Sequence, residues 1–216
     1  MVDLNVLDCS ISTKVAVGLQ DYVYIWDNST RRTTRLSTSS QNDKTLCSVR
    51  WSVSGSSLAV GLSTGSVEIW DIATSRVVRS MCMRMGRIAS LAWNGIGLTS
   101  GSRSGMMFNH DLRVRDHKVH TYSRHSLEVC GLKWAGDGRR LVSGGNDDIA
   151  CVWDARNLNV PANVFVHQAA VKAVDWSPQN TSLLATGAGS DDKKIRLFNV
   201  SLGSEIAQHD TGEQVG

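Results

Sequence analysis

Residues 132–154, LKWAGDGRRLVSGGNDDIACVWD, decide the fold of this chain. An apolar strand ends at Trp134, a Gly-Asp-Gly turn follows, and a strand of small residues runs into Gly144. A last strand closes on Trp153 and Asp154. The same plan recurs along the rest of the sequence, and self-similarity at a period of about 20–50 residues is typical of solenoids and propellers.

Two independent sets of positions share one period. The first strands of the repeats end at Cys9, Trp51, Trp93, Trp134 and Trp176. The final strands close at Trp26, Trp70, His110, Trp153 and Phe198, at intervals of 44, 40, 43 and 45 residues. This is the spacing of WD-repeat propeller blades, which have about 40–45 residues each.

Each repeat has the pattern of short alternating strands with turn residues between them, and helical periodicity is nowhere sustained. We therefore predict an all-β fold, a WD-repeat β-propeller domain of five four-stranded blades. The predicted blades span roughly residues 1–43, 44–83, 84–125, 126–167 and 168–216.

Composition narrows the classes of function. The 216 residues carry a formal net charge of +3 without a concentrated basic run, which gives no reason to expect a nucleic-acid partner. No apolar run approaches the ~18 residues of a membrane span. The five cysteines lack the paired spacing of zinc or redox sites and are typical of core residues in a reducing compartment. We expect a nuclear and cytoplasmic protein.

Two histidines and two aspartates occupy equivalent places in the fourth and fifth repeats. His125 and His167 each lie nine residues before the tryptophan of the first strand, and Asp147 and Asp192 each lie six before the closing aromatic residue. A buried carboxylate needs a hydrogen-bonding partner. We therefore expect each Asp to hold the His of its own blade, as a structural pair. The first three repeats have Gln20, Thr64 and Ser104 in the place of the Asp.

Catalytic interpretations find little support. The His–Asp pairs could form part of a catalytic triad, but no serine or cysteine lies in a nucleophile motif. The carboxylates at 147–148 and 191–192 could bind a metal, yet one of each pair is already assigned to the blade. We expect no enzyme activity, no metal and no cofactor.

Longer stretches carry a more specific resemblance. They are GSRSGMMFNHDLRV from residue 101, EVCGLKWAGDGRRLVSGGNDD from residue 128, HQAAVKAVDWSP from residue 167 and LLATGAGSDDKKIRLFNV from residue 183. Together with LNVLDCS and VYIWD near the start, they resemble the propeller of the Fizzy family, the cell-division-cycle activators of the anaphase-promoting complex. The resemblance covers practically the whole chain.

The resemblance implies a substrate-recognition subunit of this ubiquitin ligase. Such a protein binds the destruction-box, KEN-box and ABBA motifs of proteins such as cyclins, and so promotes their degradation in cell-cycle or meiotic control. The implied partners are subunits of the anaphase-promoting complex, degron-bearing proteins and spindle-checkpoint proteins. Rigid propellers suit this role because grooves between blades can hold an extended peptide.

Five residues take degron-binding roles by this resemblance. Asp8 would pair with the arginine of a destruction box, and Leu7 would line the apolar part of that groove. Asn146, Asp148 and Ser190 would line the KEN-box surface, with Asn146 and Ser190 as hydrogen-bonding groups. From the residues alone, Asp8 has a second interpretation as a surface carboxylate at a strand end.

The chain also departs from the family pattern. Cys9 stands where the family has tryptophan, Asp148 where it has asparagine, and Ala188 and Ser190 where it has glycine and threonine. The family has seven blades, so we expect an incomplete propeller. The alternative to a ligase activator is therefore a protein-interaction scaffold, or a non-activating paralogue or fragment without ligase docking.

Overall fold

The computed structural model of the chain describes residues 5–37 and 44–215, and its strands form five antiparallel sheets of four strands each. Blade 1 consists of β1 (Leu7–Cys9), β2 (Lys14–Leu19), β3 (Tyr22–Asp27) and β4 (Arg32–Ser37). Blade 2 consists of β5 (Leu46–Trp51), β6 (Ser57–Leu62), β7 (Ser66–Asp71) and β8 (Arg76–Cys82). Blade 3 consists of β9 (Ile88–Asn94), β10 (Gly97–Ser102), β11 (Met107–Asp111) and β12 (Lys118–Tyr122).

The last two blades follow the same order. Blade 4 consists of β13 (Val129–Trp134), β14 (Arg140–Gly145), β15 (Ile149–Asp154) and β16 (Asn163–Val166). Blade 5 consists of β17 (Val171–Trp176), β18 (Leu183–Ala188), β19 (Lys194–Asn199) and β20 (Ser204–Asp210). The predicted all-β fold of five four-stranded blades is confirmed. The predicted limits at residues 1, 43 and 216 lie outside the described residues.

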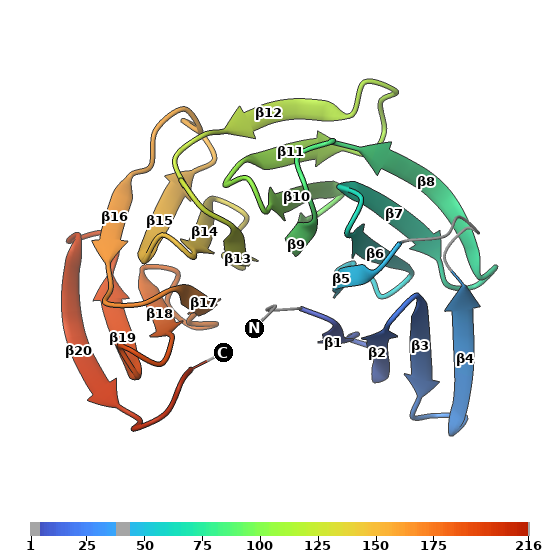
Figure 1. The fold of residues 1–216 in the computed structure, drawn as a ribbon, viewed down its shortest axis with the longest axis horizontal. Helices are drawn as coiled ribbons and strands as arrows, with labels where there is room; N and C mark the ends of the chain where they lie inside the picture. The colour runs from blue at the N-terminus through green and yellow to red at the C-terminus, as the bar shows by residue number, and fades with distance from the viewer. Residues whose placement is uncertain (1–4, 38–43, 216) are drawn as a thin grey trace.

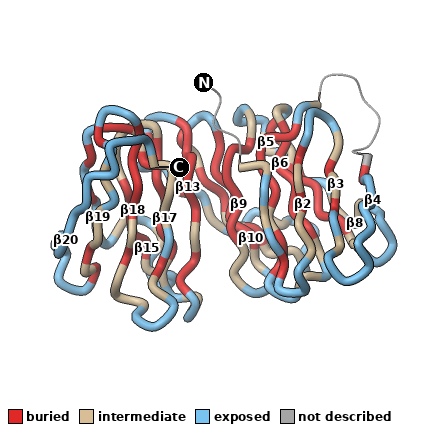
Figure 2. The backbone as a smooth tube through the Cα atoms, turned by 90° about the horizontal axis from the view of Figure 1, so that it is seen from below, coloured by how far each residue is buried: buried red, intermediate tan, exposed pale blue. Residues whose placement is uncertain are grey.

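The blades follow one another in chain order around a common centre and form an arc that is open between blades 1 and 5 (Figure 1). In every blade the first strand lies nearest the centre and the fourth lies outermost. Figure 2 shows the arc from the side, with buried residues on the facing sheets and exposed residues on the outermost strands β4 and β20.

The two ends of the strands carry different connections. The connections between first and second strands and between third and fourth strands lie at one end, which we call end A. Hydrogen bonds join them there, from Ile72 N to Ser56 O in blade 2 and from Ala155 N to Arg139 O in blade 4. The connections between second and third strands and between successive blades lie at the opposite end, end B.

Apolar side chains fill the space between neighbouring blades. The cluster between blades 1 and 2 includes Val23 and Ile25 from β3 and Leu58 and Val60 from β6. Glycine allows close approach where the inner strands meet, since a Cβ atom on Gly144 would lie 2.5 Å from the carbonyl oxygen of Val171. Such contacts fix the position of each blade relative to the next.

The described residues include no helix that is long and apolar enough to cross a membrane.

Candidate functional site

A hydrogen-bonded chain of four side chains anchors the end B turn of blade 4. His125 Nδ1 lies 2.9 Å from Asp147 Oδ1, and His125 Nε2 lies 2.8 Å from the Ser143 hydroxyl. That hydroxyl accepts a 2.9 Å hydrogen bond from the indole of Trp153. This confirms the predicted His125–Asp147 pair.

The environment of Asp147 favours its ionised form. Burial alone would raise the pKa of this carboxyl, but the hydrogen bonds from His125 and from Ser126 N outweigh it and lower the pKa. The carboxylate therefore holds the turn at residues 146–148 against the segment that enters blade 4.

The corresponding prediction for blade 5 is wrong. Asp192 accepts two hydrogen bonds from Arg196, at 2.9 and 3.1 Å, and a third from Gln168 N. His167 bonds to the Thr186 hydroxyl through Nε2, and its buried Nδ1 has no partner among the described residues. A guanidinium makes charge-assisted bonds to a carboxylate, which are stronger than those of a neutral imidazole, so Arg196 takes the place expected for His167.

Blade 3 builds a related network from different residues. His110 stands in the place of the closing tryptophan, is buried, and lies 2.8 Å from the Ser100 hydroxyl through Nε2. Its Nδ1 lies 3.1 Å from Nδ1 of His117. Burial, followed by the charges of His117, Arg79 and Lys118, lowers the pKa of His110 to about 3. The imidazole is therefore neutral in the folded protein at physiological pH.

The predicted KEN-box residues occupy two equivalent turns at end B. Asn146 and Asp148 lie in the turn between β14 and β15, and Ser190 lies in the turn between β18 and β19. Residues 167–168 connect these turns, since His167 N donates to Asp148 O and Gln168 N donates to Asp192. Asp148 has a φ of 62°, a left-handed conformation that aspartate tolerates better than most residues. Ser190 is exposed.

Asn146 is held by groups of the first strand of blade 4 and the segment before it, which the sequence did not reveal. Its N–H donates to Glu128 O at 2.8 Å, and its Oδ1 accepts from the Cys130 thiol. The Glu128 carboxylate binds the Arg87 guanidinium through two 2.5 Å hydrogen bonds, which tie blade 3 to blade 4. A signal was available, because Arg87 and Glu128 each immediately precede the first strand of their blade and carry opposite charges.

The predicted destruction-box residues lie on β1. One oxygen of Asp8 accepts a 2.7 Å hydrogen bond from Trp51 N, and the other lies 3.3 Å from the Arg50 guanidinium. Leu7 is 64% exposed. The structure therefore places Asp8 in a contact between blades 1 and 2, while Leu7 remains accessible. Asp8 and Leu7 lie on a different blade from Asn146, Asp148 and Ser190.

The site contains donors, acceptors and charges suited to holding a peptide. Among the described residues no group of three or more His, Cys, Asp or Glu side chains could hold a metal ion. An arc of four-stranded blades, with polar turns at both ends, defines a protein of the WD-repeat propeller class.

Comparison with known proteins gives the family. The model of the CDC20/Fizzy WD40 domain matches residues 2–216, so the chain belongs to the CDC20/Fizzy family. "Anaphase-promoting complex subunit cdc20" of Dictyostelium discoideum is 43% identical over 215 residues, covering 98% of this chain and 43% of the relative. "WD repeat-containing protein slp1" of Schizosaccharomyces pombe is 42% identical over 212 residues, with 98% and 43% coverage.

A solved structure agrees with these relatives. A chain of the "Crystal Structure of Mitotic Checkpoint Complex" superposes with a TM-score of 0.96 and 42% identity, covering all of this chain and 66% of that one. The present chain thus spans less than half the length of the curated relatives named here. The Fizzy resemblance and the propeller fold inferred from the sequence are confirmed.

Proposed function

We propose that this chain is the substrate-recognition propeller of an activator of the anaphase-promoting complex. The observation that carries the proposal is the match of the CDC20/Fizzy WD40 model to residues 2–216. The names of the relatives support it. One relative is named as a subunit of the anaphase-promoting complex, and another, from Arabidopsis thaliana and 40% identical to this chain, is named as a "cofactor of APC complex". In this role the chain binds degron-bearing proteins such as cyclins and promotes their ubiquitin-dependent degradation in mitosis or meiosis.

The KEN-box surface that we propose lies at end B. The backbone and Oδ1 of Asn146 are held by Glu128 and Cys130, so its Nδ2 group can donate to a peptide in a fixed direction. Asp148 adds a carboxylate two residues away, and the exposed Ser190 adds a hydroxyl from the next blade. The carboxylate favours a peptide with a cationic side chain at the matching position.

The destruction-box groove that we propose begins at β1. Leu7 supplies exposed apolar area, and a peptide arginine would reach Asp8 by sharing its carboxylate with Arg50. The partners would be subunits of the ligase and spindle-checkpoint proteins, in the nucleus and the cytoplasm. The similarity to a chain of a mitotic checkpoint complex supports the checkpoint partner.

A second candidate function is a protein-interaction scaffold that does not activate the ligase. The observation in its favour is the pairing of Asp8 with Trp51 N and Arg50, which leaves this carboxylate committed to the contact between blades 1 and 2.

Binding of labelled KEN-box and destruction-box peptides to the 216-residue chain, with ligase subunits tested in parallel, separates the two functions. We expect Asn146→Ala to weaken KEN-box binding by about tenfold, since a well-placed hydrogen bond contributes about 0.5–1.5 kcal/mol. Asn159→Ala, an exposed asparagine at end A, is the matched control. A folded chain that binds neither peptide would reject the substrate receptor and favour the scaffold.

A further inference from the structure

The turns of end A surround a cavity, and of the proposed degron-binding residues only Asp8 lines it. The cavity has a volume of about 500 Å³, within the range of ligand pockets. Its rim consists of the connections between first and second strands in blades 1 to 4, and the tryptophans at or next to the ends of the first strands of blades 2 to 4 line its wall. Four blades therefore contribute equivalent segments to one concave surface.

The rim of this cavity is apolar and exposed. Ile11 is 80% exposed and Val53 is 67% exposed, and both line the cavity. They lie at the equivalent position in successive blades, two residues after the end of the first strand. Because neither side chain is needed to fill the core, this exposed apolar area is available to a partner.

The charge of end A differs from that of end B. Among the described residues, the connections at end A carry five arginines and two aspartates, a net charge of +3. The connections at end B carry six cations and six acidic residues, a net charge of zero. The strands also begin or end at end A with charged residues, five cations and four aspartates. Counting them keeps the net charge of end A positive.

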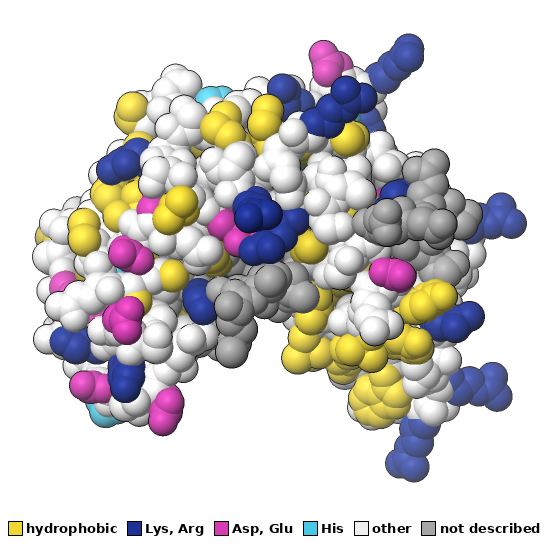
Figure 3. Space-filling model, in the orientation of Figure 1, with side chains coloured by type: hydrophobic (Ala, Val, Ile, Leu, Met, Phe, Trp, Pro, Cys, Tyr) yellow, Lys and Arg dark blue, Asp and Glu magenta, His cyan; other side chains and the backbone are white. Residues whose placement is uncertain are grey.

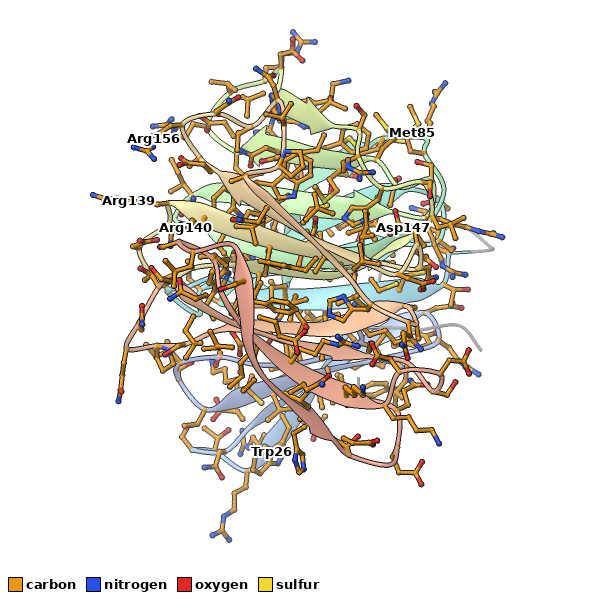
Figure 4. The ribbon with its side chains drawn as sticks, turned by 90° about the vertical axis from the view of Figure 1, so that its left-hand side faces the viewer. Trp26, Met85, Arg139, Arg140, Asp147 and Arg156 are labelled. Atoms are coloured by element: carbon orange, nitrogen blue, oxygen red, sulfur yellow. The ribbon has the colours of Figure 1, made fainter. Side chains whose placement is uncertain are left out.

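Part of this charge lies beside the cavity. Arg139 follows the glycines at 136 and 138 that line it, and the Arg139 guanidinium has no carboxylate partner among the described residues. Arg140 and Arg156 lie on the same side of the molecule, opposite Asp147 and Met85 of end B (Figure 4). Arg156 is paired with Asp154.

The charged residues that line the cavity, Asp8, Arg50 and Lys133, all form ion pairs, and the partner of Lys133 lies outside the cavity lining. Arg50 pairs with Asp8, and Lys133 pairs with Asp175. The positive excess is therefore outside the opening, where it would act on the flanks of a bound segment, while the interior accepts an uncharged side chain.

We infer that end A binds an acidic segment of a partner protein, with a large aliphatic side chain of that segment inserted into the cavity between Ile11 and Val53. Apolar contact supplies the anchor, and the flanking acidic residues of the partner face the arginines of end A. The inference is separate from KEN-box binding, because Asn146, Asp148 and Ser190 lie at end B, whereas Asp8 of the proposed destruction-box groove also lines the cavity. Both ends could be occupied at once.

The test uses fluorescence anisotropy with the 216-residue chain and short labelled peptides in which glutamates flank two leucines. We expect this acidic peptide to bind, and to bind more weakly as salt rises. Peptides with serine in place of leucine, or lysine in place of glutamate, should bind at least about tenfold more weakly.

Variants locate the surface. We expect the double substitution Ile11→Ser with Val53→Ser to weaken binding of the acidic peptide by about tenfold or more. We expect the same of Arg139→Glu alone. Leu127→Ser and Arg103→Glu change an exposed aliphatic and an exposed cationic residue at end B and should leave the affinity unchanged. The inference is overturned if the acidic peptide does not bind, if the lysine peptide binds as well, or if the end B variants weaken binding as much.

Discussion

Asp147 has a structural role, and loss of its carboxylate should destabilise the folded chain. Replacing it with alanine leaves His125 without its 2.9 Å acceptor and Ser126 N without a partner. We expect Asp147→Ala to lower the free energy of unfolding by about 2–3 kcal/mol, measured by urea denaturation. Asp191→Ala, an exposed aspartate in the equivalent turn of blade 5, should change it by less than about 0.5 kcal/mol. Equal effects of the two substitutions would contradict the assigned role.

His110 should make the stability of the chain depend on pH. Its pKa is about 3 in the folded protein, mainly because of burial, against 6.5 in the unfolded chain, so the unfolded chain binds the extra proton first. The contribution of His110 to the free energy of unfolding is fully present above about pH 6.5, and it is lost as the pH falls from there toward 3. From pH 8 to pH 5 we expect a loss of about 2 kcal/mol.

Urea denaturation at several pH values tests this dependence. His110→Phe removes the titrating group, so its stability should fall less between pH 8 and pH 5 than that of the wild type. If the two proteins lose the same stability over this interval, His110 is not the group responsible.

At the scale of single residues, spacing predicts one of the two His–Asp pairs. His125 and Asp147 meet, and the described residues place no Lys or Arg in an ion pair with this carboxylate. The same spacing fails for His167 and Asp192 because Arg196 stands four residues after the aspartate and binds it first. The alignment of blades shows which positions correspond, but the strongest available donor decides which contact forms.

At the scale of strands, the tryptophans at or next to the ends of the first strands link successive blades. The indole N–H groups of Trp51, Trp93 and Trp176 donate to the carbonyl oxygens of Asp8, Arg50 and Lys133, each 43 residues earlier. Trp134 departs from this pattern, because its N–H donates to the Thr99 hydroxyl. The sequence period predicts where these strands end, but it carries no information on the direction of the indole N–H.

Substituting Trp93 and Trp134 compares a backbone carbonyl with a side-chain hydroxyl as the acceptor of the indole hydrogen bond. Trp93→Phe leaves the Arg50 carbonyl without its donor, and we expect a loss of about 1–2 kcal/mol in the free energy of unfolding. Trp134→Phe should cost less, since the Thr99 hydroxyl can rotate toward another partner. Trp26→Phe, at an exposed indole, is the control and should be nearly neutral. A larger cost at Trp134 than at Trp93 would contradict this explanation.

At the scale of the whole molecule, the period predicts five blades, but contacts across the arc are not visible in the sequence. Asn5 illustrates this limit. Its Nδ2 donates to Ala89 O at 2.8 Å and to Cys130 O at 2.7 Å, and its N–H donates to Cys47 O. One polar side chain near the start thereby connects blades 2, 3 and 4. Residues 5–37 and 44–215 contain no second residue that makes this set of contacts, so an alignment of the repeats could not reveal it.

The face of blade 1 that points toward the open side of the arc is apolar. Leu7 lies opposite Val17, which lies opposite Tyr24, so these side chains share one face of the sheet. Trp26, on the same face, is 41% exposed. Figure 3 shows a continuous hydrophobic area over blade 1, and Figure 4 shows Trp26 at the bottom of the molecule, on the blue strands of this blade. The corresponding face of blade 5 includes Asp175 and His209 and is more polar.

An exposed apolar face of this kind favours self-association of the isolated chain. We expect sedimentation velocity to show association that increases with protein concentration. Leu7→Ser with Trp26→Ser should weaken it by at least about tenfold, because burying either side chain contributes roughly 1.5–3 kcal/mol. Leu202→Ser, which removes an exposed leucine from end A, is the control and should associate like the wild type. A wild-type chain that stays monomeric at every concentration would show that this face has no tendency to pair.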